Sequence, residues 1–227
     1  MSQSFSLVDS LAVADLQTYL SRAARVEEGS VRLIGGSGVL AVYSAILYPR
    51  GLLDQTPTVL GLRTFAIVQG ADFDAVVPIR SLLDRLARIA EAIEPAPGVG
   101  PVEIRMPLEV STVTWAGISP PRGGWRPVGE TTVELLQRTA RDGIAEVAES
   151  IPTGTGEQLV QRVRAEVWGR PIDALEYVPA GAAFAAESLG FLADGEPVSI
   201  LETGPWTRLT TKRGHTLVRR QAWSLRA

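Results

Sequence analysis

Residues 32–43, RLIGGSGVLAVY, join two apolar runs through the four small residues GGSG. Gly36, Gly38 and Ala41 have the spacing G-x-G-x-x-A of a dinucleotide-binding turn. Such a turn needs a helix directly after the glycines, because the pyrophosphate binds at the N-terminus of that helix. Half of the ten residues after Gly38 are instead β-branched or aromatic, and Pro49 interrupts the run. We therefore predict a β-hairpin at GGSG, with a nucleotide-binding turn as the alternative.

Short strands and amphipathic helices are predicted on both sides of this hairpin. Apolar residues recur at helical spacing in four segments, and a fifth helix rich in alanine is predicted from Pro179; the four segments are 8–27, 79–94, 131–149 and 155–168. Predicted strands follow one another in runs at 31–34, 39–47, 58–68, 73–77, 102–110, 198–202, 206–211 and 215–220. This order favours an α+β fold, a mostly antiparallel sheet with four or five helices packed on it.

Two strand pairings follow from the loops between predicted strands. The 73–77 strand is expected to pair with the 58–68 strand across QGAD. Arg213-Gly214 is expected to form a two-residue turn, which places Leu209 opposite Val218. The length of 227 residues suits one domain, residues 1–227, and the proline- and glycine-rich segment 94–101 is the candidate subdomain break.

The composition excludes several classes of site. The chain has no cysteine and one histidine, His215, so disulfides, thiolate metal sites and multi-histidine metal sites within one chain are ruled out. We expect no metal and no cofactor. The N-terminus has no basic region typical of a secretory signal, and no uncharged run is long enough for a membrane span. The expected location is the cytoplasm, and the oligomeric state stays open.

The stretch TWAGISPPRGGWRPVG, residues 114–129, is predicted to be a long loop that carries the function. Arg122 and Arg126 flank Trp125, and Trp115 lies upstream. Arginine offers a rigid fork of donors to carboxylate or phosphate, and tryptophan offers a stacking face. These four residues are the candidate ligand-binding site for an anionic small molecule or a protein partner. In the alternative, the tryptophans pin the segment onto the core and the arginines lie in water.

The C-terminal part of the chain is basic. Residues 203–227 hold six basic residues and no acid, and Trp206 and Trp223 lie among them. Such a surface can follow a phosphate backbone. The net charge of −3 speaks against nucleic acid as a partner, and solvated strand faces explain the same pattern. Nucleic-acid binding is therefore the third hypothesis, and His215 is expected at the surface.

The hypotheses for function follow from these candidates. The first is a non-catalytic binding or interaction protein. The second is an enzyme that acts on a phosphorylated or carboxylated metabolite, in which Arg122 or Arg126 converges with an acid such as Asp72 or Glu103. Whether the chain is an enzyme stays open.

Six stretches resemble an uncharacterised conserved protein family of actinobacteria. The most specific are centred on tryptophan, and the six are residues 16–33, 56–68, 115–125, 165–172, 179–192 and 206–219. The resemblance spans most of the chain. It implies an actinobacterial, cytoplasmic protein, in agreement with basic residues that are almost all arginine, and it carries over no activity and no site residue.

Overall fold

The computed structural model describes residues 3–219 apart from 52, 94–99, 112, 118, 153, 155 and 174. The chain folds into two compact units. Unit 1 comprises Met1–Ser44 and Leu62–Gly117, and unit 2 comprises Ala45–Gly61 and Ile118–Ala227. Most of the candidate break at 94–101 lies outside the described residues, so the organisation as a single domain stays a prediction.

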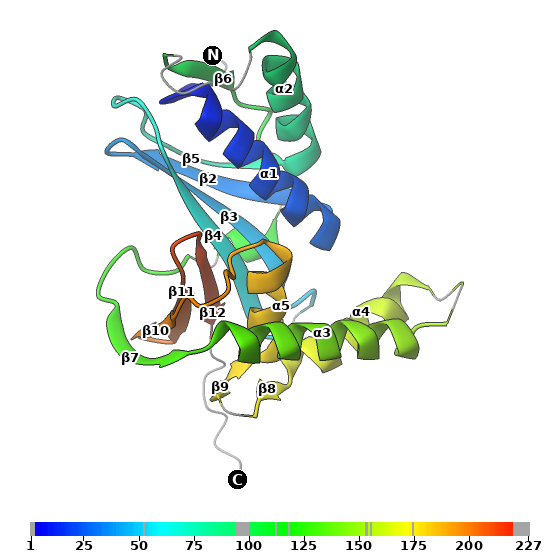
Figure 1. Cartoon of the computed structure of the whole chain (residues 1–227). Helices are drawn as coiled ribbons and strands as arrows, with labels where there is room; N and C mark the ends of the chain where they lie inside the picture. Colours follow the sequence, from blue (N-terminus) through cyan, green and yellow to red (C-terminus); the bar gives the residue numbers. More distant parts are fainter. Residues whose placement is uncertain are drawn as a thin grey trace. The chain divides into compact units, whose positions relative to one another are not determined.

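Unit 1 is built on neighbouring strands in the order β5-β2-β3-β4 (Figure 1). Their bounds are β2 Ser30–Gly36, β3 Val39–Leu47, β4 Thr58–Ala66 and β5 Phe73–Pro78, and the unit boundary falls within β3 and β4. A separate antiparallel pair joins β1, Ser4–Leu7, to β6, Val102–Arg105. Of the predicted strand 102–110, only the first four residues therefore form a strand.

The GGSG segment forms the predicted hairpin. Gly36 of β2 faces Val39 of β3, and the two residues between them, Ser37 and Gly38, have φ of 51° and 77°. Positive φ at both central positions is the geometry of a type I′ turn, whose twist matches that of the flanking strands. β3 follows the turn directly as a strand paired with β2, so the predicted hairpin is confirmed.

The expected pairing of the 73–77 strand with the 58–68 strand is wrong, because β5 pairs with β2, with Val31 opposite Val77. After β4 the chain turns to β1 instead. Ile67 forms an isolated antiparallel bridge with Leu7, and the Val68 amide donates to the Ser6 carbonyl at 2.9 Å. Because of these contacts, the QGAD loop does not bring β5 back beside β4 as a hairpin would.

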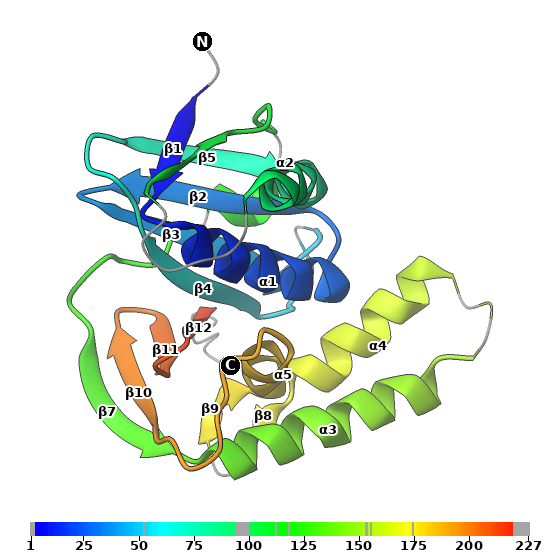
Figure 2. The same cartoon turned by 45° about the horizontal axis from the view of Figure 1, so that its top comes forward.

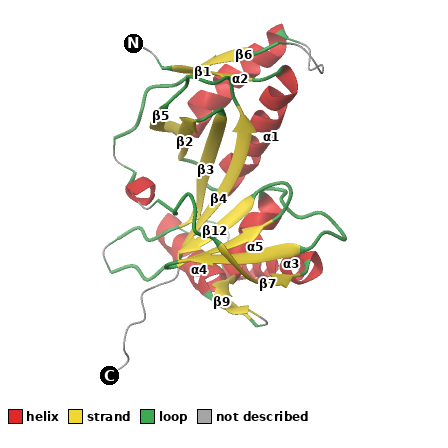
Figure 3. Cartoon of the chain, turned by 90° about the vertical axis from the view of Figure 1, so that its left-hand side faces the viewer, coloured by secondary structure: helices red, strands yellow, loops and turns green. Residues whose placement is uncertain are grey.

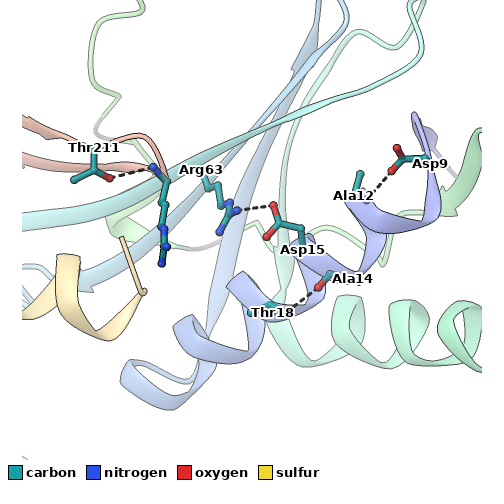
Figure 4. Close-up of polar contacts among 8 residues, drawn as sticks. Asp9, Ala12, Ala14, Asp15, Thr18, Arg63 and Thr211 are labelled. Carbon is teal, nitrogen blue, oxygen red and sulfur yellow. Dashed lines mark hydrogen bonds and ion pairs between the residues drawn. The ribbon is translucent and has the colours of Figure 1, made fainter. Parts of the chain in front are cut away.

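Two helices, α1 Ser10–Val26 and α2 Ile79–Ala92, pack against each other in unit 1. Asp9 caps α1 by accepting from the Ala12 amide at 2.8 Å (Figure 4). The helices bury one apolar face each, as their spacing predicts. The fully buried residues of these faces include Leu16, Tyr19, Leu20, Leu82 and Leu86. Arg63 of β4 pairs with Asp15 of α1 at 2.5 Å and so joins the helix to the strand (Figure 4).

Unit 2 contains neighbouring antiparallel strands in the order β12-β11-β10-β7. Their bounds are β7 Arg126–Thr131, β10 Val198–Thr203, β11 Trp206–Thr210 and β12 His215–Arg219. Two short strands, β8 Pro171–Ile172 and β9 Leu175–Pro179, form a separate pair. β7 corrects the prediction of a loop over 114–129, since the chain is extended and paired from Arg126 onward.

Three helices complete unit 2: α3 Val133–Ser150, α4 Glu157–Gly169 and α5 Ala180–Ser188. α4 runs back beside α3 (Figure 2), and both contact α5. Figure 3 shows these helices behind the strands of the unit. α5 is almost wholly buried, since its alanines allow close packing. Trp168 of α4 stacks on Phe184 of α5, with ring centroids 4.3 Å apart.

The α+β fold class and the predicted helices are confirmed. Two local details differ. The N-cap of α3 is Thr132, not Thr131, and it accepts from the Leu135 amide at 3.2 Å. The two-residue turn at Arg213-Gly214 is wrong, because Thr210 faces His215 and a four-residue loop, 211–214, lies between them. Thr155, where the expected helical segment 155–168 begins, lies outside the described residues. Among the described helices, none has the length and hydropathy needed to cross a membrane.

Candidate functional site

Trp115 lies in the core of unit 1. It belongs to a single 3-10 turn, Thr114–Gly117, and only 4% of its surface is exposed. The carbonyl of Ala116 accepts from Nη1 of Arg32 at 2.6 Å, and Arg32 also pairs with Asp74 at 2.6 Å. Trp115 therefore fits the alternative stated above, in which a tryptophan fixes the segment to the core.

Trp125 is placed differently. It belongs to unit 2, and its Nε1 donates to the carbonyl of Pro121 at 3.1 Å. This bond closes the loop 121–125, in which Gly124 has a φ of 76° that an L-residue rarely adopts. A Cβ on Gly124 would lie 3.4 Å from Oγ1 of Thr203, so this loop lies close to the end of β10. Trp125 is half-buried, and Arg122 beside it is exposed.

The Trp125 ring contacts an arginine from the basic C-terminal part of the chain, which the sequence analysis treated as a separate candidate surface. The guanidinium of Arg208, on β11, lies 4.5 Å from the centroid of this ring. A cation over an aromatic face within about 6 Å is attracted by the ring quadrupole. The loop around Trp125 and the C-terminal hairpin therefore meet at one place. No sequence signal predicted this contact, because 83 positions separate the two residues along the chain.

Strand alternation separates Arg126 from this contact. Arg126 of β7 faces Glu202 of β10, and Glu202 faces Thr207 of β11. Arg208 belongs to the next row, opposite Leu201. Neighbouring rows of an antiparallel sheet point to opposite faces. Arg126 and Arg208 therefore lie on opposite faces of the same sheet, although Arg126 follows Trp125 directly in the sequence.

The other basic residues of the C-terminal hairpin have varied surroundings. Lys212 pairs with Glu196 at 3.2 Å, whereas Arg219 at the end of β12 is exposed. Arg220 and Trp223, which the nucleic-acid hypothesis also used, lie outside the described residues.

His215 is less accessible than a surface histidine. It lies 3.1 Å from Oγ1 of Thr210 through Nδ1. Burial, together with the positive charge of Arg208, lowers the pKa of His215 to about 4. The imidazole is therefore neutral at neutral pH and does not add a positive charge to the hairpin.

The acids considered for catalysis lie in unit 1, whereas Arg122 and Arg126 lie in unit 2. Asp74, the neighbour of Asp72 two positions on, is engaged by Arg32 through two oxygens. Within the described part of the chain, no group of three or more His, Cys, Asp or Glu side chains is arranged to hold a metal ion.

The fold resembles that of solved DNA polymerase sliding clamps. A clamp from Caulobacter crescentus matches 99% of this chain and 67% of its own chain, with 12% identity and a TM-score of 0.51. The DNA polymerase III subunit beta from Borrelia burgdorferi matches 99% of this chain and 66% of its own, with 9% identity and a TM-score of 0.51. A clamp from Bacillus subtilis matches 100% of this chain and 67% of its own, with 10% identity and a TM-score of 0.50.

No curated protein matches the chain in sequence. Two family models do match, one in each half. Residues 1–104 match a domain of unknown function (DUF8010), and residues 120–223 match a second domain of unknown function (DUF8185).

Proposed function

We propose that the chain is a non-catalytic binding protein that engages an acidic region of a protein partner. The contact surface comprises Arg122, Trp125 and Arg208, here called the Arg/Trp surface, whereas Arg126 lies on the opposite face of the sheet from Arg208 and is not part of it. Trp115 is not part of it, because its ring is buried in unit 1. The main observation in support of the proposal is that the Arg208 guanidinium lies 4.5 Å from the Trp125 ring centroid.

The residue types support this proposal. Tryptophan and arginine are the types most enriched among residues that dominate binding energy at protein interfaces. Arg122 is exposed and forms no ion pair with another described residue. Free guanidinium groups complement carboxylates on a partner. β7 also lies at the edge of the order β12-β11-β10-β7 and is exposed over most of its length, which leaves a strand edge for contact.

The likeness to sliding clamps supports an interaction role by analogy of fold alone. The solved structures with this fold are named for a DNA polymerase, and we infer that this chain likewise works bound to another protein. The actinobacterial source and the cytoplasmic location stay predictions from the resemblance described above.

The proposal is tested by photo-crosslinking from Val128, an exposed residue of β7. The full chain with p-benzoylphenylalanine at this position is expressed in its source cells, and crosslinked proteins are identified by mass spectrometry. The Kd of the purified partner is then measured by calorimetry. We expect Arg122→Glu with Trp125→Ala to raise the Kd at least tenfold, whereas Arg138→Glu on the exposed face of α3 leaves it within twofold.

Other outcomes separate the alternatives. An equal Kd for all variants excludes the Arg/Trp surface as the contact. Stabilisation of the free chain by organic acids or phosphate esters, lost in the double variant, indicates an anionic small molecule instead. A mobility shift of single-stranded DNA at low salt that is lost in the same variant indicates nucleic acid.

A further inference from the structure

A long groove lies in unit 2, apart from the residues of the Arg/Trp surface. Its larger part has a volume of about 970 Å³ and an adjoining part about 440 Å³. Four residues line both parts: Asp54, Thr56, Arg162 and Ala165. The two parts are therefore one continuous groove, and its larger part alone is at the upper end of the volumes usual for ligand pockets.

The floor of the larger part is apolar and built from small or cyclic side chains. Ala165 and Gly169 of α4 lie on one side, and a Cβ added to Gly169 would lie 3.6 Å from Cδ of Pro57. Other apolar lining comes from Pro171, Pro179 and Val218. Residues this small leave room for an apolar side chain of a ligand.

Acidic residues on the walls of the larger part are already engaged. Asp54 accepts from the amides of Arg50 and Thr56 and from the Thr56 hydroxyl, and these bonds lower the pKa of its carboxyl. Glu166 pairs with Arg170 at 3.0 Å. Arg170 also pairs with Glu146 at 2.7 Å, and the two ion pairs fix the Arg170 guanidinium at the wall of the groove.

Two arginines of the larger part have no such partner among the residues whose side chains are described. Glu166 lies one helical turn after Arg162 but pairs with Arg170, and no other described carboxylate pairs with Arg162. Arg219, at the end of β12, also forms no ion pair with any residue whose side chain is described. Both side chains are exposed and line the groove. The larger part of the groove thus presents two guanidinium groups that pair with no described carboxylate, beside an apolar floor, whereas Glu157 lines only the adjoining part.

From this geometry we propose that the groove binds an extended acidic peptide segment of a partner protein, with carboxylates on Arg162 and Arg219 and an apolar side chain between them. The glutamines Gln55, Gln158 and Gln161 along the walls supply both donors and acceptors for a peptide backbone. The chain's own residues 220–227, RQAWSLRA, carry two arginines and no acid, so their charge does not complement the two arginines of the groove.

Peptide display on the full chain tests this inference. Random nonapeptides are selected against the immobilised wild-type protein, and enriched sequences are labelled with fluorescein for anisotropy. We expect a consensus of two acidic residues separated by at least one apolar residue. Arg162→Glu with Arg219→Glu should raise the Kd of these peptides at least tenfold, and the Kd should also rise with salt concentration.

Further variants separate charge from shape and this site from the Arg/Trp surface. Ala165→Trp fills the position shared by both parts of the groove and should weaken binding at least tenfold with no change of charge. Arg122→Glu and Arg138→Glu should leave the Kd within twofold. Circular dichroism confirms the fold of each variant.

Three results overturn the inference: no consensus with acidic residues, binding unchanged by both Arg162→Glu with Arg219→Glu and Ala165→Trp, or binding lost in Arg122→Glu alone. Tighter peptide binding after deletion of residues 220–227 identifies the chain's own end as the occupant and overturns it as well. Loss of the groove peptides does not bear on the Arg/Trp surface, because its test uses different residues and a different partner.

Discussion

Arg208 and Trp125, which lie 83 positions apart in the sequence, are joined within unit 2 by a cation–π contact of 4.5 Å. The contact fixes the loop before β7 to the face of β11. Trp125 is half-buried, whereas only 4% of the surface of Trp115 is exposed. Arg208, which contacts Trp125, is distant from it in the sequence. Arg126, which follows Trp125 directly in the sequence, lies on the other face of the sheet.

A double-mutant cycle measures this contact. Trp125→Ala and Arg208→Ala should each destabilise the protein, and the coupling between them should be about 0.5–1 kcal/mol, as for a partly exposed cation–π pair. Urea unfolding of the wild type, both single variants and the double variant gives the value. A parallel cycle of Trp125→Ala with Arg138→Ala should give no coupling. A Trp125–Arg208 coupling near zero contradicts the contact.

Gly143 of α3 is expected to resist substitution. In an open helix, Gly→Ala stabilises by about 1 kcal/mol, because alanine loses less backbone entropy. Here a Cβ would lie 2.3 Å from Cζ3 of Trp168, whose ring is itself held by Phe184. We therefore expect Gly143→Ala to cost about 1–3 kcal/mol by overpacking.

Gly169→Ala is the matched control for Gly143→Ala. Its Cβ would make an ordinary contact of 3.6 Å with Pro57, so the unfolding free energy should change by less than about 0.5 kcal/mol. Urea midpoints and m-values report both variants. A gain of stability in Gly143→Ala shows that α3 and α4 do not pack as described.

Stability should depend on pH through His215. Its pKa is about 4 in the folded protein, below the ordinary value of 6.5. The unfolded chain therefore binds this proton first as pH falls, and folding stability decreases between about pH 6.5 and pH 4. The contribution is fully present above pH 6.5. Urea midpoints at pH 7.5 and 5.0 should differ less in His215→Gln than in the wild type.

Acidic residues titrate in the same range, but they are present in both proteins and cancel in this comparison. An identical change of midpoint in wild type and His215→Gln means that the imidazole is accessible to solvent and titrates normally.

The buried hydroxyl of Tyr19 should contribute to the stability of unit 1. Its oxygen lies 2.9 Å from Oγ of Ser44 and 3.3 Å from the carbonyl of Val42, and burial raises the pKa of Tyr19 above its ordinary value. Tyr19→Phe leaves these groups without their buried partner and should cost about 1–2 kcal/mol. The control is Tyr177→Phe, since Tyr177 is 43% exposed.

The double variant Tyr19→Phe, Ser44→Ala should lose less free energy of unfolding than the sum of the losses in the two single variants. The reason is that both partners of the hydrogen bond are then removed together. Strict additivity of the two substitutions is the result that would rule out this hydrogen bond.

The local structure of this chain follows from signals that lie close together in the sequence. The hairpin at Ser37-Gly38 follows from small residues that tolerate positive φ and from the β-branched run after them. The helices follow from apolar spacing with caps such as Asp9, because these signals act within a few residues. The mostly antiparallel α+β class followed from the order of these elements.

Contacts between distant elements depend on how each whole unit packs and could not be predicted from local patterns. The choice of β2 over β4 as the partner of β5, the approach of Arg208 to Trp125, and the groove between α4 and the segment around Asp54 all join residues far apart in the chain. Hydrophobic burial and side-chain packing set these contacts, and neither is directional along the sequence. Periodicity shows which face of an element is apolar, and the packing of the whole unit selects what covers that face.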